Sequence, residues 1–196
     1  MERTKAGRAS DGYTAVRRRW GRTFFVALVA AATLLVTVQL ATPPTASAAV
    51  TCAKGSALDV VAHPDDDLLF QSATIRADID AGKCVRTVYV TSGDDGLPSW
   101  YWQSRESGVQ AAYAQMAGVA NRWSTSDASV PGHPIVLKTL RSAPEISLVF
   151  LRLPDGQMDG SGSADNNYES LQKLYQHVIG TIHAIDGSTS YTEASL

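Results

Sequence analysis

The chain has 196 residues, and its 17 basic and 19 acidic side chains give a formal net charge of −2. The charge is unevenly distributed, because residues 50–196 contain 10 Lys and Arg against 17 Asp and Glu, a formal charge of −7. Such an acidic body lacks the basic surface that nucleic-acid binding requires, so we expect no nucleic-acid partner. Its 147 residues are enough for one domain with its own core.

Residues 1–49 have the organisation of a secretory signal peptide. Arginines at 17–19 precede an apolar run over residues 24–40, and the sequence A-S-A at 46–48 matches an A-x-A cleavage site. We therefore expect cleavage near Ala48-Ala49, export from the cell, and no stable membrane span once the leader is removed. An uncleaved membrane anchor is the alternative, since the apolar run approaches the minimum spanning length.

The first part of the exported chain predicts a strand, a helix and a second strand. Residues 58–62 form a short, mostly apolar segment that contains Val60 and Val61, which is typical of a buried strand. A helix is expected from Asp66 or Asp67 to Ala81, with Gly82 ending it. Residues 85–91 (VRTVYVT) predict the second strand. This order favours a parallel pair joined by a right-handed crossover.

The two cysteines, Cys52 and Cys84, each lie just ahead of one of these strands. If the strands are parallel neighbours, their starts lie side by side, and the oxidising compartment of an exported protein permits a disulfide. We therefore predict a Cys52–Cys84 bridge, with two free buried thiols as the alternative.

The remaining elements complete an α/β pattern. Helices are predicted over 104–119 and 168–182, and strands over 134–140 and 146–153, with a glycine-rich polar loop at 153–167. The fold class is therefore α/β, with a mainly parallel sheet flanked by helices. Thr192 is placed to begin a further helix, so we expect that the C-terminal part of the domain is missing and that the sequence is cut short.

Chemistry-bearing residues gather at the end of the first strand. His63, Asp65, Asp66 and Asp67 follow it directly, and ligands of open α/β sheets bind at the carboxyl ends of strands. A bound cation would allow adjacent carboxylates to stay ionised, and a mixed imidazole and carboxylate set suits zinc or another divalent first-row metal. The alternatives are a helix cap with a solvated loop, and the magnesium site of a phosphoryl-transfer domain.

The spacing of these residues suggests separate roles. His63 and Asp66 are three residues apart across a proline-containing turn, so both can reach one ion while Asp65 points elsewhere. An aspartate beside the metal is placed to act as general base on a water molecule. Asp67 is expected to cap the helix or to orient a metal ligand.

Four segments in order, AHPDDD, TSGDDG, RESGVQAAYAQMAGV and LRLPDG, resemble motifs of one family. This is the family of zinc-dependent de-N-acetylases related to the GlcNAc-phosphatidylinositol and mycothiol-pathway deacetylases, often called PIG-L or LmbE-like. The resemblance implies a Rossmann-like fold and hydrolysis of an N-acetyl amide on a GlcNAc-type amino sugar or glycoconjugate. The first motif is fairly specific, whereas each later motif is weak alone.

The resemblance also implies roles for individual residues. His63 and Asp66 match the zinc ligands, and Asp65 matches the general base. Arg105 and Asp155 match positions that hold the amino-sugar substrate. Asp95 lies in a loop that supplies a further acidic contact to substrate, with Asp94 as the alternative. Asp67 replaces the more common glutamate.

One element of the family pattern is missing, because the downstream H-x-D-H-like motif that completes the zinc site does not occur in this sequence. The remaining histidines, His133, His177 and His183, stand in other contexts. Truncation before the third ligand is the more economical explanation. Two other functions therefore stay open: a catalytically silent carbohydrate-binding domain, and a metal-dependent amidase acting on another acylated small molecule. The oligomeric state is not predicted.

Overall fold

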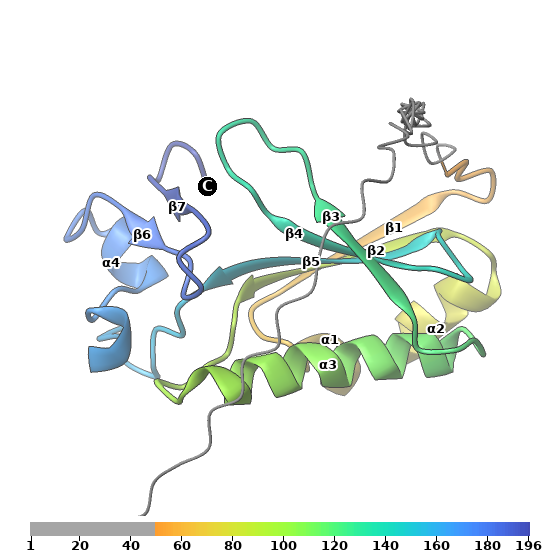
Figure 1. Ribbon diagram of the computed structural model, residues 1–196, viewed down its shortest axis with the longest axis horizontal. Coiled ribbons are helices and arrows are strands. Elements are labelled where there is room, and N and C mark those ends of the chain that lie inside the picture. The colour runs from red at the N-terminus through yellow and green to blue at the C-terminus, as the bar shows by residue number, and fades with distance from the viewer. Residues whose placement is uncertain (1–49) are drawn as a thin grey trace, which may run out of the picture. The chain divides into compact units, whose positions relative to one another are not determined.

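The computed structural model describes residues 50–196, so the signal peptide predicted for residues 1–49 lies outside the described residues. The described chain forms a five-stranded sheet in the order β1-β2-β5-β4-β3 (Figure 1). Its strands are β1 (Ser56–Val61), β2 (Cys84–Thr91), β5 (Ile146–Leu153), β4 (Val136–Leu140) and β3 (Trp123–Asp127). The first three pair in parallel, and β4 and β3 extend the sheet in the antiparallel sense. The α/β prediction is confirmed, although β3 was not predicted.

Three helices lie on one face of this sheet (Figure 1). The helix predicted from Asp66 to Ala81 is interrupted at Gln71, whose φ of −126° is not helical, and becomes α1 (Asp66–Phe70) and α2 (Ser72–Asp80). Gly82 has a φ of 72° and ends α2 as predicted. Helix α3 (Ser99–Met116) starts five residues earlier than the predicted range.

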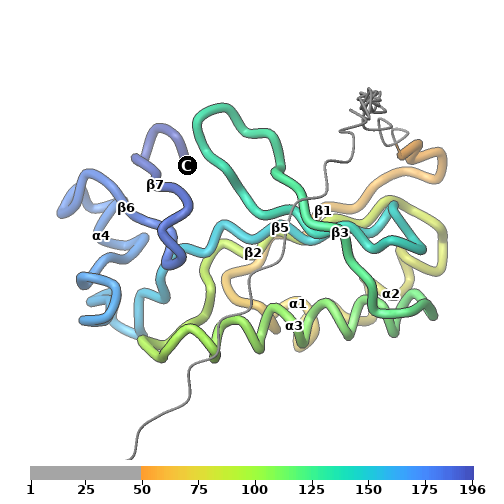
Figure 2. The backbone as a smooth tube through the Cα atoms, viewed as in Figure 1, coloured from red at the N-terminus to blue at the C-terminus, as the bar shows by residue number. Residues whose placement is uncertain are grey.

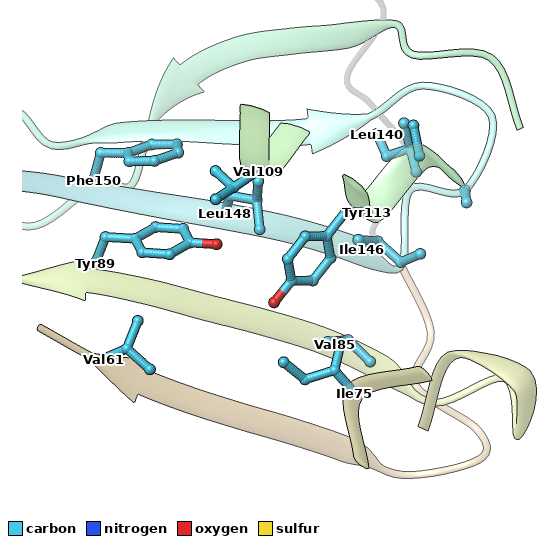
Figure 3. Close-up of a cluster of buried hydrophobic side chains, with 12 residues drawn as sticks. Val61, Ile75, Val85, Tyr89, Val109, Tyr113, Leu140, Ile146, Leu148 and Phe150 are labelled. Carbon is cyan, nitrogen blue, oxygen red and sulfur yellow. The ribbon is translucent and has the colours of Figure 1, made fainter. Parts of the chain in front are cut away.

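The core between the helices and the sheet is apolar and fully enclosed. Side chains of α2 and α3 point towards β2 and β5, and the rings of Tyr89 and Phe150 stack with centroids 5.0 Å apart (Figure 3). Each fully buried aliphatic or aromatic side chain contributes about 1.5–3 kcal/mol. The buried residues labelled there are Val61, Ile75, Val85, Tyr89, Val109, Tyr113, Leu140, Ile146, Leu148 and Phe150. This packing holds the carboxyl ends of β1, β2 and β5 against one another.

A covalent bond links the chain just before β1 to the amino-terminal end of β2. Cys52 and Cys84 form a disulfide with Cα atoms 5.4 Å apart, which confirms the predicted bridge. Ser56 and Cys84 are register partners at the start of the parallel pair.

The C-terminal segment differs from its prediction. In place of a helix over 168–182, the chain forms the short helix α4 (Leu171–Tyr175) and the strand β6 (Ile182–His183), and a 3-10 turn (Ala164–Asn166) precedes them. The helix prediction is wrong because Tyr168 and His177 both adopt a φ of 57°, which no right-handed helix accommodates.

A second apolar cluster lies on the other face of β5. Leu174 of α4, Ile182 of β6 and Tyr191 of β7 (Ser190–Tyr191) pack with Val149 and Leu153. The β3–β4 loop lies beside this segment, because the ring of His133 stacks on that of Tyr191 (Figure 2). From Thr192 onward the described residues form one hydrogen-bonded turn, in which Ser195 and Leu196 donate their backbone N–H groups to the Thr192 carbonyl, each at 3.1 Å. No helix among residues 50–196 is long and apolar enough to cross a membrane.

Candidate active site

The carboxyl ends of three parallel strands meet at one edge of the sheet. Thr91, the last residue of β2, donates both its backbone N–H and its hydroxyl to the carbonyl of Ala62, each at 2.9 Å. Ser92 donates its N–H to the carbonyl of Leu153 at the end of β5, at 2.8 Å. The loops after β1, β2 and β5 therefore leave the sheet together, which is where open α/β sheets bind ligands.

His63 and Asp66 face each other in the turn after β1. His63 Nδ1 lies 3.2 Å from Asp66 Oδ2, and the backbone N–H of His63 donates to the same oxygen at 2.8 Å. Two ligands bound tetrahedrally to zinc at about 2.0–2.1 Å lie about 3.3 Å apart. The 3.2 Å separation is that of a hydrogen bond, and it is also compatible with two ligands of one ion. The other ring nitrogen, Nε2, lies 3.7 Å from Asp155 Oδ2.

Asp65 lies in the same turn but has a different partner. Arg105 of α3 donates from Nη2 to Asp65 Oδ1 at 2.5 Å and from Nη1 to the carbonyl of Gly93 at 2.7 Å. The Asp65 side chain is 46% exposed, so water can reach it. Gly93 has a φ of 59°, and a Cβ there would lie 2.7 Å from Arg105 Nη1. The glycine therefore allows the guanidinium to approach the loop closely.

Asp155 is held by the loop that follows β2. Its backbone N–H donates to Asp94 Oδ1 at 2.8 Å, and the Asp94 carboxylate also accepts from Ser92, Gly96 and Asn166. Asp94 is 2% exposed, and its carboxylate links the β2 and β5 loops by hydrogen bonds. The structure thus brings Asp155 to His63.

Asp95 is not brought to this group. It is exposed, adopts a φ of 52°, and lines a separate hollow of about 570 Å³ together with Met158 and Asp165. Its predicted contact with substrate is untested by this geometry, since the hollow does not contain His63 or Asp65.

Asp67 is a buried residue of α1 next to the site. It is fully buried, and its Oδ2 accepts hydrogen bonds from Tyr89 (2.7 Å) and Tyr113 (2.8 Å). Burial raises the pKa of Asp67 by more than these hydrogen bonds lower it. The prediction that Asp67 caps the helix is wrong, because the N-cap residue of α1 is Asp65 and no side chain caps it. Asp67 instead anchors α1 to the core.

The remaining histidines lie among other partners. His133 stacks on Tyr191, the ring of His177 lies 3.2 Å from the carboxylate of Glu193, and His183 contacts Glu169 at 2.8 Å. Within residues 50–196 no group of three or more His, Cys, Asp or Glu side chains is arranged to hold a metal ion. The donor set His63 and Asp66 therefore fits zinc as a two-ligand half-site, and the described residues add no third protein ligand.

An ion-pair cluster next to the site was not foreseen from the sequence. Arg152 of β5 donates to both carboxylate oxygens of Glu106 (2.7 and 2.8 Å) and to Asp186 (2.5 Å), and its guanidinium lies 4.8 Å from the ring centroid of Trp102. Glu106 follows Arg105 in α3, and Arg152 lies three residues before Asp155. The only signal was that both residues fall within the motifs RESG and LRLPDG.

This cluster sits at an irregularity of β5. Tyr89 pairs with Phe150 but Thr91 pairs with Leu153, so β5 contains one extra residue, and Arg152 there has a φ of 57°. Such a bulge changes the direction of the strand end. Burial alone would raise the pKa of Asp186, but hydrogen bonds from Ser188 and Arg152 hold that pKa below its ordinary value.

Taken together, the parallel strand ends, the His63–Asp66 pair and the Asp65–Arg105 pair define an α/β protein with a candidate hydrolytic site. Residues 58–190 match the family model PIG-L, described as GlcNAc-PI de-N-acetylase. The chain therefore belongs to the PIG-L family of de-N-acetylases, and the family resemblance expected from the motifs is confirmed. The comparisons with curated proteins and with solved structures found no match.

Proposed function

We propose that the chain is an exported zinc-dependent hydrolase that removes the N-acetyl group from a GlcNAc-type amino sugar or glycoconjugate. The observation that carries this proposal is the turn after β1. There His63 and Asp66 are spaced as two ligands of one ion, while the adjacent Asp65 is turned to Arg105 and remains accessible to water. Family membership supports the reaction class.

His63 Nδ1 and Asp66 Oδ2 are the atoms that would hold zinc. When bound, zinc polarises the acetamide carbonyl and lowers the pKa of a nearby water molecule toward about 7. Another divalent first-row metal would supply the same chemistry.

Asp65 is the general base of the proposed reaction. It accepts a proton as water adds to the acyl carbon, and it returns that proton to the nitrogen as the C–N bond breaks, which yields acetate and a free amine. Arg105 keeps the Asp65 carboxylate in place through Nη2. Asp155, with Oδ2 3.7 Å from His63 Nε2, is within reach of a sugar hydroxyl beside the metal.

The proposed location is extracellular. The Cys52–Cys84 disulfide is consistent with an oxidising compartment, because structural disulfides are rare in the cytosol. The leader-like residues 1–49 point in the same direction.

Zinc content and acetate release of the full chain test the proposal. Asp66→Asn is expected to lose bound zinc. Asp65→Asn is expected to keep zinc and to lower kcat on N-acetylglucosamine glycosides by about 10²–10⁴-fold, the usual contribution of a general base. Asp80→Asn is the matched control, since within residues 50–196 the Asp80 side chain pairs with the exposed Arg76 of α2 and with no other basic residue.

Two ligands among the described residues also suit a second candidate, a sugar-binding domain without catalysis. It would bind N-acetylglucosamine glycosides without zinc and release no acetate. An amidase for another acylated small molecule would bind zinc, lose it in Asp66→Asn, and release acetate or another acid only from non-sugar amides. Equal zinc content in the parent and Asp66→Asn would contradict the proposed site.

A further inference from the structure

A polar groove lies on the other side of the Arg152 cluster from the candidate site. Two hollows of about 690 and 250 Å³ share the lining residues Ser107, Gln110 and Lys138, so they adjoin each other, and the two together make up the groove. One wall is α3, and the opposite wall includes Lys138 of β4 and Trp123 of β3. The larger hollow alone falls within the range of ligand pockets, about 300–1,000 Å³.

The groove starts beside the site. Glu106, which lines it, follows Arg105 directly, and Arg152, which also lines it, lies three residues before Asp155. The same turn of α3 therefore presents Arg105 to the Asp65 carboxylate and Glu106 to the end of the groove.

The charges of the lining balance. Arg152 is paired with Glu106 and Asp186, and Lys138 donates to the hydroxyl of Thr125 at 2.8 Å. Two basic and two acidic side chains line the larger hollow, so it offers no net charge to a polyanion. Among the described residues, Ile185 is the one aliphatic residue of its lining. Trp102 also lines the hollow, but the Arg152 guanidinium lies 4.8 Å from its ring centroid, so little apolar surface is offered to a ligand.

The other lining groups suit a ligand rich in hydroxyls. The amides of Gln103, Gln110 and Asn121 supply donors and acceptors. The Ser107 hydroxyl donates to the Gln103 carbonyl at 2.9 Å and supplies an acceptor. Gln110 donates to the Glu106 carbonyl at 2.9 Å, and within the described residues its own side-chain oxygen accepts no hydrogen bond. Trp123 adds an aromatic surface, with its indole N–H fixed on Asn121 at 2.8 Å.

We propose that this groove binds a neutral oligosaccharide, so that the chain acts on a sugar polymer whose further residues lie along α3. The claim that the oligosaccharide is the substrate rests on the proposed deacetylase function. The claim that the groove binds an oligosaccharide does not. Hydroxyls of the glycan take the places of water on the amides and on Ser107, and one sugar ring lies against Trp123.

Binding to the full chain carrying His63→Ala, which prevents turnover, tests the groove. The probes are the β-1,4-linked tetramer of N-acetylglucosamine and the monosaccharide, measured by isothermal titration calorimetry. The tetramer is expected to bind at least tenfold more tightly than the monosaccharide. Ser107→Trp, which fills the junction of the two hollows, is expected to remove that advantage, and Gln110→Ala is expected to reduce it severalfold.

Gln115→Trp is the matched control, because Gln115 is an exposed residue of α3 outside the groove. It is expected to leave tetramer binding unchanged. Equal binding of tetramer and monosaccharide by the parent overturns the proposal, as does tetramer binding that Ser107→Trp and Gln110→Ala both leave intact. Far-UV circular dichroism identifies a variant that fails to fold, in which case Gln110→Ala decides. If the chain with His63 intact released no acetate while the His63→Ala chain bound the tetramer in the groove, only the deacetylase function would be contradicted.

Discussion

Replacing Arg152 by methionine should be one of the most damaging single substitutions in the described part of the chain. The side chains of Arg152 and Glu106 are 15% and 6% exposed, and Arg152 binds two carboxylates. Its loss leaves Glu106 and Asp186 charged and without their cation. Removing one partner of a buried ion pair costs about 3–5 kcal/mol. Since small domains are stable by about 5–15 kcal/mol, the variant should unfold at clearly lower urea concentration at pH 7.

Arg76→Met is the matched control for this prediction. Arg76 also contacts both carboxylate oxygens of an aspartate, Asp80, but from Nε alone (2.9 and 2.8 Å), and both side chains are more than half exposed. Exposed pairs contribute about 0–1 kcal/mol, so this variant should unfold close to the parent. The double variant Glu106→Gln with Arg152→Met should recover part of the free energy of unfolding that Arg152→Met alone loses. The reasoning is refuted if Arg152→Met and Arg76→Met shift the urea midpoint equally.

Three further outcomes are expected. Tyr113→Phe removes a hydrogen bond to the buried Asp67 and should cost about 1–3 kcal/mol in urea unfolding; no change would mean that Asp67 does not depend on it. Reducing the Cys52–Cys84 bond opens a link across 32 residues and should cost about 4 kcal/mol on the chain-entropy model, seen as a lower Tm with dithiothreitol; an unchanged Tm would contradict this. Because the folded-state pKa of Asp186 is lowered, its ionisation stabilises the protein above the ordinary value of 3.8, and this stability is lost as pH falls through the folded pKa. Asp186→Asn should therefore destabilise the protein at pH 7 and much less at pH 3, and an equal loss at both would refute the assignment.

The parallel core of the fold could be predicted because its signals are local. Residues 58–62 and 85–91 are mostly apolar segments that contain β-branched residues, and Gly82 marks the end of the intervening helix. The first strand is less buried than predicted, because Leu58 and Val60 are 65% and 58% exposed. The disulfide followed from the expected register of these two strands. The C-terminal segment could not be predicted in this way. Tyr168 and His177 have positive φ values there, a conformation that residues other than glycine rarely adopt, so no residue-type signal marked these breaks.

The candidate site, like the fold, could be predicted only where its signals are local. His63, Asp65 and Asp66 lie within one turn, so spacing alone indicated that His63 and Asp66 face each other while Asp65 does not join them. Local spacing could not predict the partners of Asp65 and Asp67. Arg105, the partner of Asp65, lies 40 residues away along the chain, and Tyr113, a partner of Asp67, lies 46 residues away. Asp94 and Asp95 are adjacent in sequence, yet one is buried and the other is exposed.

The bulge in β5 explains why the Arg152 cluster lies where it does. A non-glycine residue at a φ of 57° costs about 1–3 kcal/mol, and such a conformation persists only where its surroundings determine it. Here the two ion pairs of Arg152 supply that constraint. The extra residue changes how the chain leaves β5, and three residues later Asp155 meets His63. The strain at Arg152 therefore lies in the strand end that leads to Asp155, whose position is also fixed by the hydrogen bond from its backbone N–H to Asp94.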